Sequence, residues 1–439
     1  MKLPLPALLA CLLGLAGGAH ATADVTELVV ATVNNGHMIE MQRQARQFEA
    51  ANRDIRLRWE TLEEGVLRQR VTTDVASGGS RYDVLTIGMY ETQIWARRGW
   101  LLPLDLPADY DADDLLPTVR RGLSLNGRLY ALPFYAESSM LMLRTDLAAK
   151  AGVSLPERPS WSQVRDAAAR MHDPAAGVYG ICLRGKPGWG DNMALVTTMA
   201  NAHGGQWFDM AWKPQLESRP WKDAVTLYVE LLSRYGPPGA AADGYNELLT
   251  LFQEGRCAMW VDATVAASFV SDPRHSKVAG HVAFLQAPQA VTAKGANWLW
   301  AWALAVPSAS RHPAAAQRFA AWATSRAYVQ QVAASAGWAA VPTGTRQSTY
   351  DNAALARSAA FSAAERKAID SVNPDDPTLP RSPYSGVQYA AIPEFQAIGV
   401  AVGQQIAAAL AGRQSVPQAL AAAQQACERA LREGGYFGR

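Results

Sequence analysis

Hydrophobic residues occupy alternate positions in the segment "WLWAWALAVP" (298–307), where Trp298, Trp300 and Trp302 are separated by leucine or alanine. Alternation with a period of two predicts a β-strand with the indoles on one face and small side chains on the other. Three tryptophans in phase provide more aromatic area than one strand usually needs to bury. The pattern therefore raises the question of which groups the indoles contact.

The first hundred residues alternate between strand-like and helix-like periodicity. Apolar or alternating runs predict strands at 28–33, 55–62 and 82–88, and apolar residues at helical spacing occur between them at 38–48 and 67–75. Strands that alternate with helices in this way usually pair in parallel. We therefore expect an α/β fold.

Further along the chain, the pattern predicts more strands, a helix and a loop. The segment 128–147 has the pattern of one strand running into another, with a break at Pro133. A helix is expected from Trp161 to Met171, and the last hundred residues are expected to be mostly helical. The proline-rich segment 371–386 is expected to be a long loop. Additional strands are predicted at 177–184, 256–263, 281–288 and 298–307.

The N-terminal residues have the pattern of a secretory signal peptide. Lys2 provides a basic start, an apolar run follows over 3–18, and "AHA" at 19–21 matches a cleavage site. Cleavage after Ala21 would release the mature chain into the periplasm. Lipid attachment at Cys11 is the alternative, because "LLAC" is similar to a lipidation site. This apolar run is too short to cross a membrane and no other long apolar run exists, so we expect no membrane insertion.

The charge balance bears on possible partners and cofactors. The 439 residues include 41 lysines and arginines and 39 aspartates and glutamates, and no basic cluster is interleaved with aromatic residues. We therefore expect no nucleic-acid partner. Seven scattered histidines without metal-ligand spacing predict neither a metal site nor a cofactor.

Three cysteines remain after removal of the predicted signal peptide, namely Cys182, Cys257 and Cys427. Their odd number and the absence of a CxxC motif favour free buried thiols. One disulfide is the alternative, and the sequence leaves open whether Cys182 and Cys257 are bonded.

Successive segments of the chain resemble one protein family, the family 1 extracellular solute-binding proteins. These are the receptors of ABC importers related to maltose-binding protein. The similar segments are "NRDIRLRWETLEEGVLRQRVTTDVASGGSRYDVLTIG", "RRGWLLPLDLP", "LYALPFYAESSMLMLRTDL" and "SWSQVRDAA". A second set resembles the branch that binds sorbitol and mannitol, and its segments are "ATVNNGHMIEMQRQARQFEA", "YGICLRGKPGWGDNMALV", "AMWVDATVAASF", "KGANWLWAWALAVP" and "VQYAAIPEFQAIG".

The resemblance implies a two-lobed periplasmic binding protein fold of the α/β class, with a hinge and a ligand cleft between the lobes. The first lobe is expected to comprise 24–134 and 263–325, and the second lobe 135–262 and 326–439. The implied function is that of a monomeric receptor without catalytic activity. It would bind a sugar alcohol (sorbitol, mannitol or arabitol) in the cleft and deliver it to the permease subunits of an ABC importer.

Candidate ligand-binding residues follow from the rule that ligands of open α/β sheets lie outside the carboxyl ends of strands. The residues that follow or end predicted strands are Asn35, Glu63, Tyr90, Glu137, Arg184 and Asp262. The resemblance adds Trp298, with Trp300 on the same face of its strand. Gln388, from the long loop, is a further candidate. Asp262 has an alternative role as the N-cap of a following helix, and Arg184 as a structural partner of Asp191.

These residue types suit an uncharged ligand with many hydroxyl groups. Each hydroxyl is both a donor and an acceptor, so carboxylates accept from it while arginine or asparagine donates to it. Indole faces cover the C–H surface of such a ligand and exclude water. Two alternatives remain, namely a receptor for a ring sugar or oligosaccharide and an exported glycan-active enzyme that uses paired carboxylates.

Overall fold

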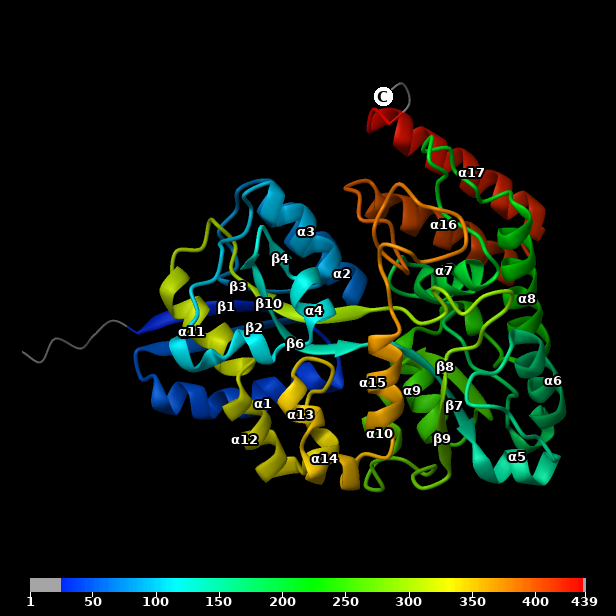
Figure 1. Cartoon of the computed structure of the whole chain (residues 1–439), viewed down its shortest axis with the longest axis horizontal. Coiled ribbons are helices and arrows are strands. Elements are labelled where there is room, and N and C mark those ends of the chain that lie inside the picture. The colour runs from blue at the N-terminus through cyan, green and yellow to red at the C-terminus, as the bar shows by residue number, and fades with distance from the viewer. Residues whose placement is uncertain (1–24, 437–439) are drawn as a thin grey trace, which may run out of the picture.

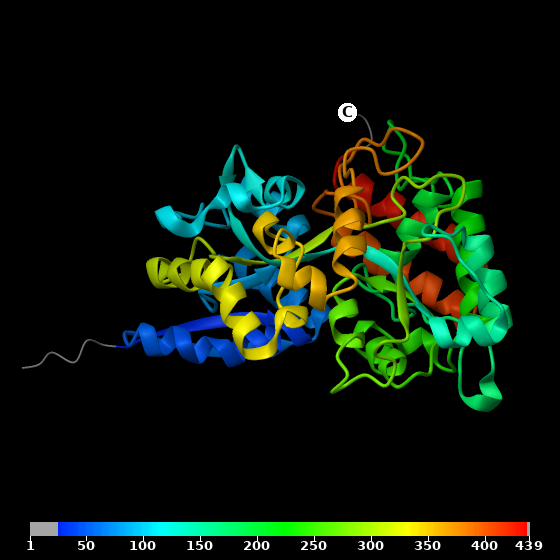
Figure 2. The ribbon, with the colours of Figure 1, turned by 60° about the horizontal axis from the view of Figure 1, so that its bottom comes forward.

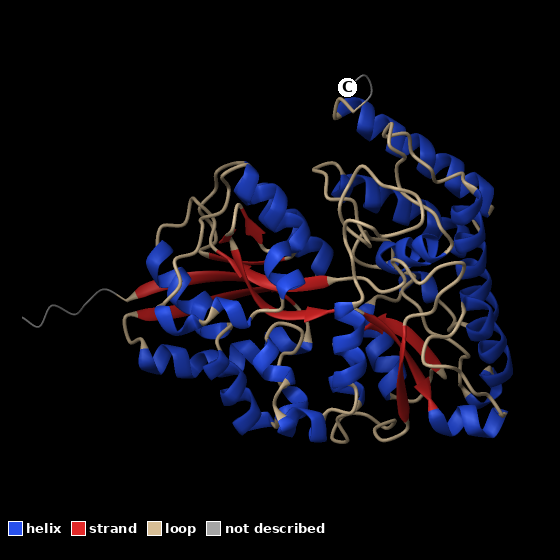
Figure 3. Ribbon diagram, in the orientation of Figure 1, coloured by secondary structure: helices blue, strands red, loops and turns tan. Residues whose placement is uncertain are grey.

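The computed structural model describes residues 25–436, in which the chain forms two α/β lobes side by side (Figure 1). Each lobe is built around its own sheet, and helices pack around both sheets (Figure 3). The predicted signal peptide (1–21), including Cys11 and the cleavage site, lies outside the described residues. No helix within 25–436 is both long and apolar enough to cross a membrane.

The sheet of the first lobe has five strands in the order β2-β1-β3-β10-β6. β1 pairs in parallel with β2 and β3, as the alternating pattern predicts, whereas β10 pairs antiparallel with β3 and β6. The strands are β1 (Thr26–Val33), β2 (Ile55–Leu62), β3 (Val84–Ile87), β6 (Ala131–Glu137) and β10 (Trp300–Ala305). The three strands predicted near the N-terminus are therefore confirmed.

Helices α1 and α11 cover one face of this sheet, and α2 and α3 cover the other (Figure 1). Polar residues at the strand ends start the helices: Asn35 Oδ1 accepts from the Met38 amide at 3.1 Å, and Glu63 Oε2 accepts from the Val66 amide at 3.2 Å. The helices of this lobe are α1 (Gly36–Ala51), α2 (Glu64–Ala76), α3 (Met89–Arg97), α4 (Pro117–Gly122), α11 (Pro313–Ala323), α12 (Arg326–Ala336), α13 (Gln347–Tyr350) and α14 (Ala353–Ser358).

Smaller elements complete the first lobe. The hairpin of β4 (Ser124–Leu125) and β5 (Arg128–Leu129) turns at Asn126 and Gly127, which both have positive φ. An Asn-Gly pair suits this turn because both residues tolerate the left-handed region. The 3₁₀ helices within residues 25–436 are η1 (Ala108–Tyr110), η2 (Ala112–Asp114), η3 (Pro174–Ala176), η4 (Ala240–Ala242) and η5 (Trp338–Ala340).

The sheet of the second lobe has three antiparallel strands in the order β8-β7-β9. α6 forms over the residues predicted for it because Ser160 and Gln163 form a reciprocal cap, with hydrogen bonds of 3.1 and 2.8 Å. The strands are β7 (Ser139–Arg144), β8 (Met259–Ala263) and β9 (Val282–Gln286). The helices are α5 (Thr145–Ala151), α6 (Trp161–Met171), α7 (Asn192–Ala202), α8 (Arg219–Tyr235), α9 (Tyr245–Gln253), α10 (Ala266–Val270), α16 (Phe395–Leu410) and α17 (Val416–Glu433).

The segment 177–184, predicted to be a strand, forms no continuous ladder. It runs parallel to β8 and to the residues just before β8, and it pairs with them at two isolated bridges, Tyr179 to Cys257 and Cys182 to Trp260. Gly180 packs so closely on α6 that a Cβ atom there would lie 2.2 Å from the Ala168 carbonyl oxygen. Gly180 lies between the two bridges, so the close packing on α6 occurs where the pairing with β8 is interrupted.

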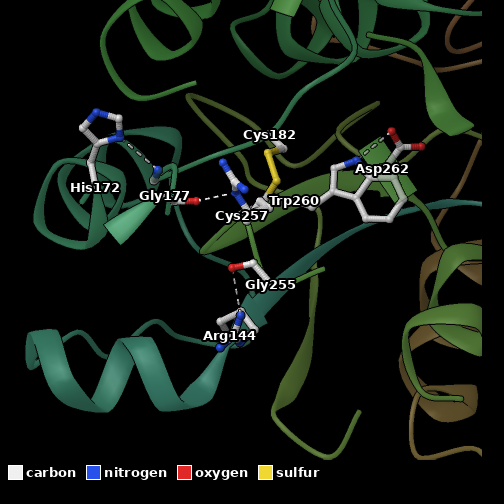
Figure 4. Close-up of a disulfide and its surroundings, with 10 residues drawn as sticks. Arg144, His172, Gly177, Cys182, Gly255, Cys257, Trp260 and Asp262 are labelled. Carbon is white, nitrogen blue, oxygen red and sulfur yellow. Dashed lines mark hydrogen bonds between the residues drawn. A yellow bond between two sulfur atoms is a disulfide. The ribbon is translucent and has the colours of Figure 1, made fainter. Parts of the chain in front are cut away.

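A disulfide joins Cys182 to Cys257, with 5.9 Å between their Cα atoms (Figure 4). The preference for free thiols was therefore wrong for this pair, while Cys427 is free and buried in α17. Because the two bonded residues are 75 positions apart, their proximity depends on the tertiary fold. The bond anchors the segment that leads to Arg184 beside the strand that contains Asp262.

Three segments connect the lobes. In the first, β6 passes into β7 at Ser138, and the second leads into β10. The third runs through α15 (Ser362–Asp370), which lies between the lobes in both Figure 1 and Figure 2. The Ser138 hydroxyl donates to the Trp298 carbonyl at 2.7 Å, so the first two connections run side by side.

The predicted break at Pro133 is wrong, because the strand continues through it and ends only before Ser138. Pro133 lies inside β6, where the register with β10 shifts between Trp302 and Ala303. An irregularity of this kind accommodates a residue that has no amide hydrogen to donate.

The lobes also differ from the predicted boundaries. β9 pairs with β7 in the second lobe, although it falls within the range 263–325 that was assigned to the first. α12 falls within 326–439, yet it packs on the first lobe, where Gln331 Nε2 donates to Gln44 Oε1 of α1 at 2.7 Å. The chain crosses between lobes just before β10 and again near α15, and a local sequence pattern does not reveal which sheet a strand joins.

Candidate functional site

A cavity of about 220 Å³ lies between the lobes, where β1, β2 and β6 end. Its wall contains most of the residues that the sequence singled out. These are Asn35, Glu63, Glu137, Arg184, Trp298, Trp300 and Gln388. The structure places Tyr90 and Asp262 behind this wall.

Glu137 ends β6 and faces the cavity with 7% of its surface exposed. No hydrogen-bond partner for its carboxyl group exists among residues 25–436. Burial raises the pKa of this carboxyl to about 8, although the nearby Arg184 guanidinium acts in the opposite direction. A carboxyl group in this state can both donate to a ligand and accept from it.

Arg184 is held by Asp262 through a forked contact. Arg184 Nε lies 3.0 and 3.1 Å from the two carboxylate oxygens, and Nη2 lies 2.6 Å from Oδ1. The Trp260 indole also donates to Asp262 Oδ2 at 3.0 Å (Figure 4). Burial works against the charge on Arg184, yet Asp262 holds the pKa of the guanidinium above its usual range. Asp262 thus orients Arg184 and is fully buried, and it caps no helix.

Tyr90 contacts the opposite lobe instead of the cavity. Its hydroxyl donates to the carbonyls of Ile392 and Pro393 at 3.0 and 3.2 Å, and it accepts from the Gln396 amide at 3.2 Å. The ring lies 5.1 Å from that of Trp189, measured between centroids. Tyr90 follows β3 as predicted, but α3 directs it toward the loop before α16.

Two of the predicted amides are largely occupied by the protein itself. Asn35 Nδ2 donates to the Tyr135 hydroxyl at 2.9 Å, and its oxygen caps α1. Gln388 Nε2 donates to the Leu299 carbonyl at 2.8 Å, while its oxygen accepts from the Leu299 amide at 3.4 Å. Both side chains therefore border the cavity and also hold its wall in shape.

Two indoles of the segment 298–307, Trp300 and Trp302, contact the guanidinium of Arg68, a residue that the sequence patterns did not single out. Arg68 Cζ lies 4.8 and 4.9 Å from the ring centroids of Trp300 and Trp302. It also lies 4.0 Å from the ring of Trp189, which belongs to the other lobe. These distances are those of cation–π contacts. Trp302 also lines the cavity.

Arg68 is in turn neutralised by two carboxylates of its own lobe. Glu64 accepts from Arg68 Nε and Nη2 at 3.0 and 2.9 Å, and Glu91 accepts from Nη1. Glu91 also accepts from the Gly88 amide at 3.0 Å. The spacing of Glu64 and Arg68, four residues apart on a helix, was a signal for their pairing. Nothing in that spacing indicated the three indoles.

Contacts between the lobes show that the structure is closed around the cavity. Lys186 Nζ donates to Glu63 Oε1 at 2.6 Å, and Asn246 Nδ2 donates to the Asn34 carbonyl at 3.1 Å. Partial burial disfavours the charge on Glu63, but the hydrogen bonds from Lys186 and from a backbone amide lower its pKa. Each contact joins residues more than a hundred positions apart, on opposite lobes.

Several donors at the cavity wall lack a partner within the described part of the chain. They are Trp189 Nε1, Trp300 Nε1 and the Tyr245 hydroxyl, all of which are buried. Buried donors normally have acceptors, so such a group at a cavity wall is suited to a ligand oxygen. The part of the chain from 25 to 436 contains no cluster of three or more metal-ligating side chains.

Comparisons with known proteins agree with this architecture. A family model described as "Bacterial extracellular solute-binding protein" matches residues 35–330. A mannitol-binding protein of Pseudomonas aeruginosa is 55% identical over 410 residues, which cover 93% of this chain and 94% of that protein.

Solved structures give the same result for the fold. The solute-binding protein from Agrobacterium vitis S4, crystallised with bound D-mannitol, is 53% identical with a TM-score of 0.93, and the match covers 94% of this chain and 100% of that one. A protein from Agrobacterium radiobacter K84 with ribitol is 24% identical, and the match covers 93% of this chain and 99% of that one with a TM-score of 0.81, which supports the fold alone. The two lobes have the periplasmic binding protein fold, and the chain belongs to the bacterial extracellular solute-binding proteins.

Proposed function

We propose that this protein is the receptor of an ABC importer for a linear sugar alcohol, with D-mannitol the first candidate and sorbitol and arabitol close alternatives. The observation that supports this most directly is the cavity wall, which combines carboxyl groups, a held arginine and unpartnered donors with four indoles. The relatives with the highest identity given above are a mannitol-binding protein and a structure that contains D-mannitol.

The chemistry of the wall suits hydroxyl groups. Indole N–H groups only donate, so Trp189 and Trp300 require acceptors, whereas Glu137 and Asp191 provide carboxyl groups. A polyol chain offers a donor and an acceptor at each carbon and meets both needs. Acidic residues outnumber basic residues on the wall, which disfavours an anionic ligand.

The size of the cavity favours a small ligand. Its volume of about 220 Å³ is below the roughly 300–1,000 Å³ of sites that hold drug-sized molecules. Trp189 and Arg68 meet directly across the closed lobes, so a longer chain has no passage between them. An oligosaccharide would require the lobes to remain further apart.

The proposed roles of the wall residues follow from their free groups. Glu137 and Arg184 bind ligand hydroxyls, and Trp298 and Trp300 cover the carbon chain. The remaining predicted residues (Asn35, Glu63 and Gln388) border the ligand while holding the wall, and Tyr90 and Asp262 act from behind it. Asp191, Trp189 and Tyr245 join the set, since they line the same cavity.

The proposal also includes the cellular context. The mature chain, produced by cleavage after Ala21, would act in the periplasm as a monomer without catalytic activity. Both lobes in their closed arrangement would contact the permease subunits. We propose no cofactor, because binding and lobe closure require none.

Calorimetric titration of the mature protein with mannitol, sorbitol, arabitol, glucose and maltose tests this function. We expect saturable binding of at least one sugar alcohol, weakened by Trp298→Ala, because that indole lines the cavity. Trp338→Ala is the matched control, since Trp338 is half-buried in η5 and away from the cavity wall. Binding of maltose with no response to any sugar alcohol would contradict the proposal.

A further inference from the structure

Resting on the proposed function, we propose that ligand binding is coupled to proton release from Glu137. In this exchange, hydroxyl groups of the ligand donate to the carboxylate oxygens, and the proton of the carboxyl group passes to water and from there to a buffer base. No covalent bond of the ligand changes. The inference goes beyond identifying Glu137 as a contact, because it specifies the protonation state before and after binding.

The pairing of charges leaves Glu137 without a cation in ion-pair contact, although Arg184 is nearby. Each basic residue of the cavity wall already contacts other carboxylates. The pairs are Lys186 with Glu63, Arg184 with Asp262, and Arg68 with Glu64 and Glu91. The contact between Arg184 and Asp262 is forked and uses one edge of the guanidinium, so this cation is already compensated.

A buried carboxylate without a cation or a hydrogen-bond donor is costly, and such a group takes up a proton instead. The pKa of Glu137, raised to about 8 by burial, is consistent with that outcome. Several ionisable groups from other elements face it. Arg184 favours its charge, whereas the acidic groups of Asp262 in β8, Glu64 in α2 and Glu365 in α15 oppose it. Two tyrosines also interact with it, Tyr135 of β6 and Tyr245 of α9.

A bound polyol changes this balance in one direction. Each hydroxyl that donates to the carboxyl oxygens stabilises the charged form and lowers the pKa. Further loss of hydration opposes this effect, but Glu137 is already only 7% exposed, so little hydration remains to be lost. The added hydrogen-bond donors therefore outweigh the loss of hydration and lower the pKa of Glu137. The complex consequently binds fewer protons than the free protein.

Two other carboxyl groups are alternative sources of a released proton. Burial also raises the pKa of Glu365 and that of Asp191 to about 7. Glu365 lies outside the cavity wall, and its oxygens already accept hydrogen bonds from Thr264, Thr343 and Tyr350 at 3.1, 3.0 and 2.8 Å. Asp191 lines the cavity and is therefore the direct rival.

The test is calorimetric titration of the mature protein with mannitol, or with the sugar alcohol that binds best, in buffers of different ionisation enthalpy at one pH. The slope of the observed enthalpy against the buffer enthalpy gives the number of protons released. We expect release of a fraction of one proton. Because the free protein holds the proton, the affinity should increase as the pH rises toward about 8 and level off above it, by at most about tenfold per pH unit.

Three variants assign the proton. Glu137→Gln should abolish the slope, whereas Asp191→Asn and Glu365→Gln should retain it. If Glu137→Gln binds too weakly to titrate, infrared difference spectra of the unmodified protein take the place of calorimetry on this variant. The protonated-carboxyl band should then lose intensity on ligand addition, and should do so also in Asp191→Asn.

The titrations distinguish failure of this inference from failure of the proposed receptor function. Binding with the same enthalpy in every buffer, or release that disappears in Asp191→Asn and persists in Glu137→Gln, would overturn this inference and leave the receptor function intact. Absence of binding to every sugar alcohol would instead overturn the proposed function, together with the inference that rests on it.

Discussion

Arg184 is oriented before any ligand arrives, because Asp262 accepts from its guanidinium on one edge and the Gly190 carbonyl accepts from Nη1 at 2.7 Å. Both side chains of this pair are buried. Paired buried charges add little net stability compared with apolar residues, but removal of one partner leaves the other without compensation. The pair therefore positions a donor at the cavity wall, and loss of either partner would destabilise the protein.

We expect Asp262→Asn to lower the free energy of unfolding of the ligand-free protein by about 3–5 kcal/mol, because a buried guanidinium loses its counter-charge. Urea denaturation measures the change. The matched control is Asp223→Asn, which breaks the exposed pair of Arg219 and Asp223 and should change stability by about 1 kcal/mol or less. Equal effects of the two variants would contradict the prediction.

At the scale of elements, the segment 177–184 is held by a disulfide as well as by backbone pairing. Two isolated bridges pair it with the chain at β8, and the bond from Cys182 to Cys257 joins it there covalently (Figure 4). Arg184 is the last residue of this segment, so the disulfide stabilises the position of a cavity residue as well as the lobe. A disulfide also agrees with the proposed export to the periplasm, an oxidising compartment.

The double variant Cys182→Ala/Cys257→Ala should lose about 2–4 kcal/mol of unfolding free energy, because the bond closes a loop of 75 residues in the unfolded chain. Guanidinium denaturation with and without a thiol reductant measures this loss. The reductant should destabilise the unmodified protein and leave the double variant unchanged. A reductant effect of the same size in both proteins would mean that the bond does not provide the stability.

At the scale of the molecule, the two lobes meet through a small number of polar contacts around the cavity. Lys186 and Glu63 form an ion pair between the lobes, and both side chains are partly exposed. Exposed pairs contribute about 0.2–1 kcal/mol and weaken with salt. The lobes are therefore held closed by the whole wall, to which this pair adds a modest bias.

We expect Lys186→Ala to weaken sugar-alcohol binding by at most about fivefold at low salt, and by less at high salt. Titration at two ionic strengths measures both effects. Lys277→Ala removes an exposed pair with Glu254 inside one lobe and should leave the affinity unchanged. A loss larger than tenfold that persists at high salt would show that Lys186 binds the ligand itself and is not mainly a contact between lobes.

Sequence patterns determined the features that depend on neighbours along the chain. The strands β1 to β3 and their parallel pairing, the capped helix α6, and the polar residues at the strand ends all follow from local periodicity and short-range hydrogen bonds. Asn35, Glu63 and Glu137 therefore line the cavity. The resemblance to a family then supplied the two lobes, which no local pattern specifies.

The tertiary structure alone decided which distant groups meet. Arg68 is an ordinary helix residue in the sequence, and only the closed lobes bring Trp189, Trp300 and Trp302 around its guanidinium. The same holds for the disulfide, for Asp262 behind Arg184, for the contact of Tyr90 with the opposite lobe, and for the lobe that β9 and α12 join. The physical reason is that these contacts join segments far apart in the chain, where proximity depends on the packing of complete elements and leaves no period or spacing in the sequence.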